Sequence, residues 1–239
     1  MRIIYVDDIE DGRAVVTGSD VKHLRVLRLK PGDNIRVSDG CCNTYNGMIE
    51  SLTTEKAVIF LSDKKKIYKR DFSLTLFHAL CKSDKNEFTV QKAAELGADK
   101  VVLFFSENCA VRVNDKTGAK IERLNKIARE ASVQCGREIP MTVDGVFSFD
   151  KALDMLYISD IPLFFYELGD VRFSQKLKNC DLHGSISIMI GSEGGFSKDE
   201  AEAVSGKGIP LLSLGSRILR TETVPLVVLG ILNERLGEF

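Results

Sequence analysis

The chain has 239 residues, 44% of them hydrophobic, and a formal net charge of −1. Such a composition is ordinary for a globular protein and excludes a disordered chain, while the length suits one small and one medium domain. The longest apolar stretch, residues 224–232, is far shorter than the ~20 residues that span a bilayer, so no membrane segment is predicted. Asp7 and Asp8 follow too soon after Met1 for a secretory segment, and we expect a cytoplasmic protein.

Cysteine spacing and the distribution of charge indicate which partners to expect. The six cysteines form no C-x-x-C pair and no spacing typical of a zinc site, so we expect reduced thiols and no metal. Basic residues gather in two segments, residues 22–36 and 64–70. Such segments can bind phosphate groups even in a near-neutral protein, or they can be solvated surfaces. The charge pattern leaves both interpretations open.

The first part of the chain is predicted to form a small β-barrel. Short apolar stretches with turn residues between them predict strands at residues 1–6, 14–16, 34–37, 45–49 and 57–61. A helix is predicted over residues 19–29, and it carries the first basic segment. The composition becomes highly charged around residues 62–70, which places the domain boundary there. The predicted domains are therefore residues 1–70 and 71–239.

The second part is predicted to be an α/β domain with a mostly parallel sheet, because strand-like stretches alternate with amphipathic helices. Two capping boxes are predicted, Asp84 with Glu87 and Ser197 with Glu200. Strands are predicted at residues 73–80, 100–105, 163–166, 185–190 and 210–214, and helices at residues 84–97, 120–135, 197–206 and 223–236. The last helix is apolar around its circumference, which indicates burial by the core and by a partner subunit.

Three segments follow predicted strands at the edge where open α/β sheets bind ligands: residues 166–169, 191–196 and 214–222. Glycines in the second allow close approach of the backbone to a ligand, although this loop taken alone favours a structural turn. The P-loop and dinucleotide patterns are absent. A hydrolase nucleophile elbow is excluded because Ile190 stands where its first glycine belongs, and no histidine follows Ser192. We assign the histidines no role.

Five motifs are distinctive. They are, in chain order, His23-Leu24-Arg25-Val26-Leu27-Arg28-Leu29, Lys92-Ala93-Ala94-Glu95-Leu96-Gly97, Arg129-Glu130-Ala131-Ser132-Val133-Gln134-Cys135-Gly136-Arg137, Ile190-Gly191-Ser192-Glu193-Gly194-Gly195-Phe196 and Leu214-Gly215-Ser216-Arg217-Ile218-Leu219-Arg220-Thr221-Glu222-Thr223. Together they resemble SPOUT methyltransferases of the ribosomal RNA small subunit methyltransferase E family. The resemblance covers essentially the whole chain. Where many members carry proline, this chain has Ser192 and Ser216. The resemblance implies an N-terminal PUA-like barrel, a C-terminal SPOUT domain with a trefoil knot, and a homodimer.

The resemblance also implies a chemistry, methylation of N3 of a uridine in 16S ribosomal RNA with S-adenosylmethionine as cofactor. The cofactor-binding residues it implies are Tyr166, Glu167, Gly191, Ser192, Glu193, Gly194, Leu214, Gly215, Ile218, Leu219, Arg220 and Thr221. The RNA-binding residues we expect are Arg25, Arg28, Lys65, Lys66 and Arg129. Arg220 and Arg137 are the catalytic candidates, since a guanidinium can stabilise negative charge on the base, although both can instead hold loops or phosphates. No general base is assigned.

Two other functions stay open on the sequence. The chain can be a methyltransferase for another RNA position, including a ribose 2′-OH, because the loop chemistry suits any methyl acceptor. It can also be a non-catalytic RNA-binding dimer, in which the second domain only dimerises. Binding of S-adenosylmethionine discriminates the last possibility from the other two.

Overall fold

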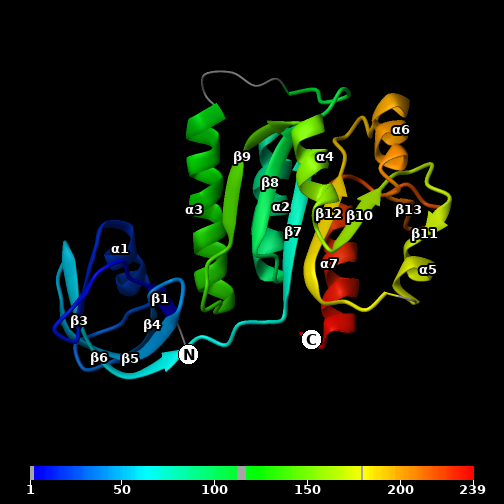
Figure 1. Ribbon diagram of the computed structural model, residues 1–239. Coiled ribbons are helices and arrows are strands. Elements are labelled where there is room, and N and C mark those ends of the chain that lie inside the picture. Colours follow the sequence, from blue (N-terminus) through cyan, green and yellow to red (C-terminus); the bar gives the residue numbers. More distant parts are fainter. Residues whose placement is uncertain (1–2, 112–116, 179) are drawn as a thin grey trace. The chain divides into compact units, whose positions relative to one another are not determined.

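The computed structural model describes residues 3–111, 117–178 and 180–239 (Figure 1). Contacts within the chain define two compact units. The first comprises Met1–Lys69 and Ser132–Pro140, and the second comprises Arg70–Ala131 and Met141–Phe239. Within the described ranges, no helix has both the length and the apolar character that crossing a bilayer requires.

The first unit is a curled, mostly antiparallel sheet with one helix, as the strand pattern predicts. The strand order is β1-β4-β5-β6-β3-β2, and only the pairing of β1 with β4 is parallel. Its elements are β1 (Ile3–Tyr5), β2 (Ile9–Glu10), β3 (Arg13–Thr17), α1 (Gly18–Val26), β4 (Asn34–Ser38), β5 (Asn43–Leu52) and β6 (Lys56–Lys66). Alternate strand residues and the buried side of α1 form one apolar core.

One strand of this unit is longer than the sequence predicts, and one glycine is required by the packing of its core. Strand β6 continues to Lys66 and pairs there with Asn43, so the charged segment expected to be a linker is partly strand. Gly47 permits the curled core, because a Cβ atom there would lie 2.7 Å from the Ile59 side chain and 2.8 Å from the Val37 side chain. Because β6 pairs with β5 as far as Lys66, the basic end of β6 is part of the sheet.

The second unit is built on a parallel sheet of seven strands, in the order β11-β13-β10-β12-β7-β8-β9. The α/β prediction is therefore confirmed, while the knotted path of the chain stays a prediction. The strands are β7 (Phe72–Ala79), β8 (Lys100–Phe105), β9 (Thr142–Ser148), β10 (Ile161–Phe165), β11 (Val171–Arg172), β12 (Gly184–Ile190) and β13 (Leu211–Ser213). The helices are α2 (Ser83–Glu95), α3 (Thr117–Cys135), α4 (Phe149–Tyr157), α5 (Phe173–Lys178), α6 (Lys198–Gly206) and α7 (Thr223–Leu236).

Helices cover both faces of this sheet, because successive strand residues point to opposite sides. On one face Leu76 and Leu103 pack with α2, α3, α5 and α7. On the other, Phe77 and Phe104 pack with α4 and α6. Both faces of the central strands are thus buried, and function is confined to the sheet edges and the loops that leave them.

The helix ends test the two capping predictions. Ser197 and Glu200 form the predicted capping box at the start of α6. The prediction for Asp84 and Glu87 was wrong, because α2 begins one residue earlier, with Lys82 at the N-cap and no side-chain cap. Glu87 instead pairs with Arg123 across to α3, at 2.8 Å.

Candidate active site

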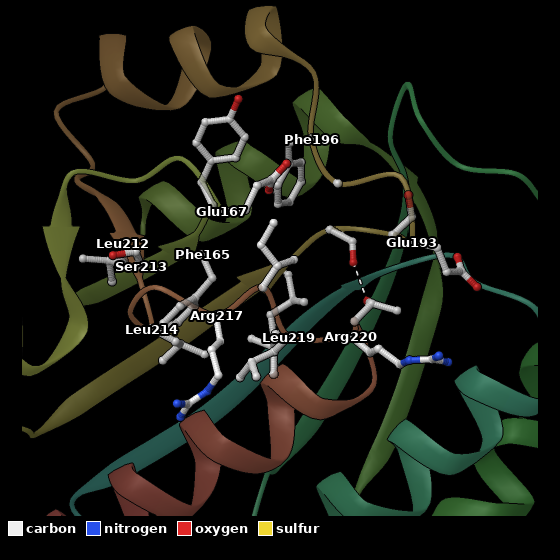
Figure 2. Close-up of a pocket in the computed structure, with 18 of the residues that line it drawn as sticks. Phe165, Glu167, Glu193, Phe196, Leu212, Ser213, Leu214, Arg217, Leu219 and Arg220 are labelled. Carbon is white, nitrogen blue, oxygen red and sulfur yellow. Dashed lines mark hydrogen bonds between the residues drawn. The ribbon is translucent and has the colours of Figure 1, made fainter.

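Strands β10, β12 and β13 are parallel neighbours, so their carboxyl ends and the loops after them meet at one edge of the sheet. Those loops line a cavity of about 430 Å³, a size common for small-molecule sites. Figure 2 shows the lining, with Glu167 from the first loop, Glu193 from the second, and Leu219 and Arg220 from the third. Three segments distant in sequence therefore contribute to one pocket.

The glycine loop, residues 191–196, follows β12 and is held from outside the pocket. Its Ser192 hydroxyl donates to the carbonyl of Asn108 at 3.1 Å, and the Asn108 amide donates to the carbonyl of Gly194 at 3.2 Å. A Cβ atom on Gly194 would lie 2.8 Å from the Asn108 carbonyl oxygen, and one on Gly195 would lie 2.8 Å from Glu167. The glycines are required by close packing on two sides.

The last loop, residues 214–222, is joined directly to the glycine loop. Gly215 has a φ of 121°, a backbone conformation that favours glycine. The buried Thr221 hydroxyl donates to the Gly191 carbonyl at 2.6 Å. This hydrogen bond fixes the distance between the second and third loops at the point where they leave the sheet.

A lysine on α2 pairs with one carboxylate from each of these loops. Lys85 Nζ lies 3.2 Å from Glu222 and 3.5 Å from Glu193. Burial alone would lower the pKa of Lys85, but the two carboxylates outweigh it and raise the pKa. Burial alone would raise the pKa of Glu193, but its backbone N–H, the Cys81 thiol, the backbone N–H of Lys82 and the charge of Lys85 together lower it. Both groups are charged at neutral pH, and Glu193 is a weak proton acceptor.

Two arginines of the last loop lie on different sides of the pocket. Both side chains are exposed. In Figure 2 the Arg220 guanidinium lies below Glu193, whereas the Arg217 guanidinium points away from that side. Arg220 therefore presents a fixed positive charge in the lining of the cavity, on the same side as Glu193 in Figure 2.

Comparisons with known proteins agree with this arrangement. Residues 69–233 match the model of an RNA methyltransferase domain, and residues 16–62 match that of an RNA methyltransferase PUA domain. The ribosomal RNA small subunit methyltransferase E of Bacillus subtilis is 32% identical over 230 residues, which cover 90% of this chain and 87% of that protein. The chain belongs to the ribosomal RNA small subunit methyltransferase E family.

Two further comparisons extend across both units. The methyltransferase E of Rickettsia conorii is 31% identical over 212 residues, covering 86% of this chain and 82% of that protein. A crystal structure of the methyltransferase E of Neisseria gonorrhoeae bound to S-adenosyl methionine has a TM-score of 0.85, at 25% identity and 98% coverage of both chains. The resemblance seen in the sequence is thus confirmed at the level of family and fold.

The residues implied by methyltransferase E membership for the cofactor all line the cavity. They are Tyr166, Glu167, Gly191, Ser192, Glu193, Gly194, Leu214, Gly215, Ile218, Leu219, Arg220 and Thr221. Ile218 is 83% exposed although it lines the cavity. Contact of these residues with the cofactor stays a prediction.

The residues expected to bind RNA or act on it are more dispersed. Arg137 belongs to the first unit, where its Nε donates to the Ile139 carbonyl at 3.1 Å, and it does not line the cavity. Arg129 lies on α3 in the second unit. Of the two catalytic candidates, the structure places only Arg220 in the pocket. The other expected RNA-binding residues, which are all exposed and in the first unit, are Arg25, Arg28, Lys65 and Lys66.

Sequence reasoning missed three residues at this site. The sequence contained a signal for Lys85, because this residue lies in the first turn of the helix after β7, a neighbour of β12 in the same parallel sheet. Asn108 lies in the loop after β8 and had no comparable motif. His78 was assigned no role, yet it is fully buried on β7 with Nε2 3.4 Å from the Thr221 hydroxyl.

Proposed function

We propose that the protein transfers the methyl group of S-adenosylmethionine to N3 of a uridine in 16S ribosomal RNA. The observation that carries this proposal is the convergence of three strand-end loops on one cavity, in a chain of the methyltransferase E family. The cavity volume of about 430 Å³ lies in the range that is usual for pockets that bind small molecules. The glycine loop offers backbone groups at close range, and Glu167 offers a carboxylate in the pocket wall.

The chemistry needs positioning and charge stabilisation rather than a protein nucleophile. When bound, the cofactor supplies an electrophilic methyl group on a sulfonium, and the uridine N3 is the nucleophile once its proton is lost. The chain must align N3 with the methyl carbon and stabilise negative charge on O2 and O4 of the base. Arg220 performs the second task in this proposal, because it is the arginine on the Glu193 side of the pocket.

The first unit binds RNA in this proposal, mainly through phosphates. Arg25 and Arg28 lie at and just after the end of α1, and Lys65 and Lys66 lie at the end of β6. All four side chains are exposed, and the match to an RNA methyltransferase PUA domain supports the assignment. Arg129 on α3 adds a further positive charge in the second unit.

The active protein is a homodimer in this proposal. Helix α7 buries Val228, Leu229 and Leu232 in the core of its own chain. Its opposite side carries Leu226, Val227 and Ile231, which the chain leaves partly or substantially exposed. An apolar helix face that its own chain covers only in part supports a subunit interface.

Nucleoside analysis of small-subunit ribosomal RNA tests the reaction directly. A strain that lacks this protein is expected to lose one N3-methylated uridine, and the wild-type gene is expected to restore it. Loss of a different methylated nucleoside would assign the protein to another RNA position. Unchanged rRNA, together with absence of S-adenosylmethionine binding, would support the non-catalytic RNA-binding dimer.

A further inference from the structure

A buried polar cluster lies directly behind the candidate active site and joins three parts of the sheet. His78 comes from β7, Gly191 follows β12, and Thr221 precedes α7. The Thr221 hydroxyl lies 2.6 Å from the Gly191 carbonyl oxygen and 3.4 Å from His78 Nε2. His78 and Thr221 are 0% and 7% exposed, so water does not substitute for these contacts from the surface.

Hydrogen-bond accounting fixes the direction of each bond in the cluster. The Thr221 hydroxyl has one proton, and the carbonyl of Gly191 can only accept, so that proton is donated to Gly191. The same hydroxyl must then accept from His78, which requires the proton of the neutral imidazole to be on Nε2. With the proton on Nδ1 instead, Nε2 has nothing to donate, and its hydrogen bond with the Thr221 hydroxyl, whose own proton goes to Gly191, is lost.

Neighbouring groups hold the cluster on a rigid base. The Asn86 side chain accepts from the Cys81 backbone N–H at 3.1 Å and donates to the Cys81 carbonyl at 2.6 Å. The Cys81 sulfur lies 3.9 Å from the Thr221 hydroxyl. The segment between β7 and α2 therefore contacts Thr221 as well.

We propose that His78 is a positioning residue, which holds the Thr221 hydroxyl against the Gly191 carbonyl and so sets the spacing of the two loops that form the pocket. The inference rests on the proposed function and extends it. His78 does not line the cavity, so it acts only through Thr221. If these loops shift, the methyl group of the bound cofactor moves out of line with N3 of the base. Reaction rates are sensitive to such misplacement.

The test compares cofactor affinity with turnover in matched variants. His78→Phe keeps a ring but removes the donor, and it is expected to lower kcat by about tenfold or more, because misplacement by ~1 Å can cost ~100-fold in rate. His78→Gln retains an N–H donor and is expected to recover most of the rate. Thr221→Val is expected to resemble His78→Phe, and Thr221→Ser, which keeps the hydroxyl, to retain more of the rate than Thr221→Val. The double variant His78→Phe with Thr221→Val is expected to be no slower than the slower single variant. Each substitution removes the same hydrogen bond between residues 78 and 221, so their effects do not add.

The control is Thr89→Val, which applies the same substitution to a buried threonine whose hydroxyl has no partner in the described structure. It is expected to keep wild-type kcat and cofactor affinity. The proposal is overturned if His78→Phe turns over at the wild-type rate, or if the losses of the two single variants multiply in the double variant. If the wild type itself binds no S-adenosylmethionine, the proposed function fails, which is a separate result.

A spectroscopic test covers the case in which His78→Phe does not fold. The chain has three histidines, so the imidazole nitrogens of His78 can be assigned by NMR in the wild-type protein labelled with ¹⁵N. The expected signature at neutral pH is a single tautomer with the proton on Nε2, which is perturbed by Thr221→Val and retained in Thr221→Ser. A ring that averages between tautomers, or one unaffected by Thr221→Val, would contradict the proposal.

Discussion

The charged residues of the pocket differ in their surroundings. Lys85 neutralises part of the charge of Glu193 and Glu222, and the lowered pKa of Glu193 makes it a poor proton acceptor. Arg220 lines the same cavity, and in the proposed mechanism its charge acts on the base. The proposal therefore assigns transition-state stabilisation and the ordering of the loops to different residues.

Arg220→Ala is expected to lower turnover more than RNA affinity. Negative charge on O2 or O4 grows as the N3 proton leaves, so the arginine contributes more in the transition state than in the ground state. Lost donors of this kind typically cost ~100- to 1000-fold in rate. Single-turnover kinetics and RNA binding measure the two effects, with Arg217→Ala as the control because that side chain points elsewhere. Equal losses of binding and rate would make Arg220 a positioning residue.

Gly194→Ala is expected to weaken cofactor binding. The added Cβ atom would lie 2.8 Å from the Asn108 carbonyl oxygen, so either the glycine loop or the loop after β8 must move. Overpacking costs about 1–3 kcal/mol, which corresponds to roughly a 5- to 150-fold loss of affinity if the glycine loop bears the strain. Calorimetry with S-adenosylmethionine measures the affinity of each variant for the cofactor. Gly206→Ala is the control, because a Cβ atom there meets nothing within 4 Å; equal affinities of the two variants would remove the glycine loop from the pocket assignment.

At the scale of elements, α7 connects the pocket to the proposed subunit interface. Val224 in its first turn lines the cavity, while Ile231 two turns later is 38% exposed. Ile231→Glu places a charge on the apolar face and is expected to dissociate the dimer, as measured by sedimentation equilibrium. Ile158→Glu is the matched control, since Ile158 is 80% exposed after α4 and should not affect assembly. A wild-type monomer, or an Ile231→Glu dimer of unchanged affinity, would contradict the interface.

The sequence predicted elements well where local signals agree with packing. Ser197 and Glu200 form their capping box, and α7 has the predicted bounds, because its apolar residues and Pro225 leave few alternatives. The capping box at Asp84 was wrong, since α2 begins at Ser83 and has no side-chain cap. Strand β9 carries polar and glycine residues at the sheet edge and was not predicted. Helix α4 was also missed, although Phe149, Leu153 and Leu156 follow helical spacing after the Ser148 N-cap.

The site was predictable only in part, for a physical reason. Glycines and arginines after strands are visible in the sequence, and parallel topology brings strand ends together. The bonds that brace the loops, such as Asn108 with Gly194 or His78 with Thr221, join residues 86 and 143 positions apart. No local pattern encodes such pairs, so they appear only in the folded chain.

At the scale of the whole molecule, the net charge of −1 hides a local concentration of cations in the first unit. Lys65→Gln with Lys66→Gln is expected to reduce the slope of log affinity against log salt by roughly 1.4 to 1.8, since each phosphate contact contributes about 0.7 to 0.9. Arg25→Gln with Arg28→Gln is expected to act equally. Lys151→Gln with Lys198→Gln, two exposed residues of the second unit, should leave the slope unchanged. Identical slopes for all variants would identify the basic segments as solvated surfaces.

Stability is expected to fall in weak acid because of His78. Burial lowers its pKa from 6.5 to about 4, so the unfolded chain binds a proton more readily than the folded one. The contribution of neutral His78 to the free energy of unfolding is complete above about pH 6.5. It is lost as the pH falls toward 4, by up to about 3 kcal/mol. Urea unfolding at pH 7 and pH 5 should show a smaller decrease for His78→Gln than for the wild type. His183→Gln, with a 65% exposed side chain, is the control, and equal decreases in all three would exclude this origin.

The first unit takes part of its structure from a segment far along the chain. In Ser132–Pro140, the Arg137 carbonyl accepts from Tyr5 at 2.7 Å, and Glu138 accepts from Ser38 at 2.6 Å and pairs with Arg36. A gene fragment that stops after codon 70 therefore omits partners of Tyr5, Arg36 and Ser38. Any attempt to excise the first unit, or to graft it onto another protein, has to supply this nine-residue stretch as well, by a designed linker or as a separate peptide.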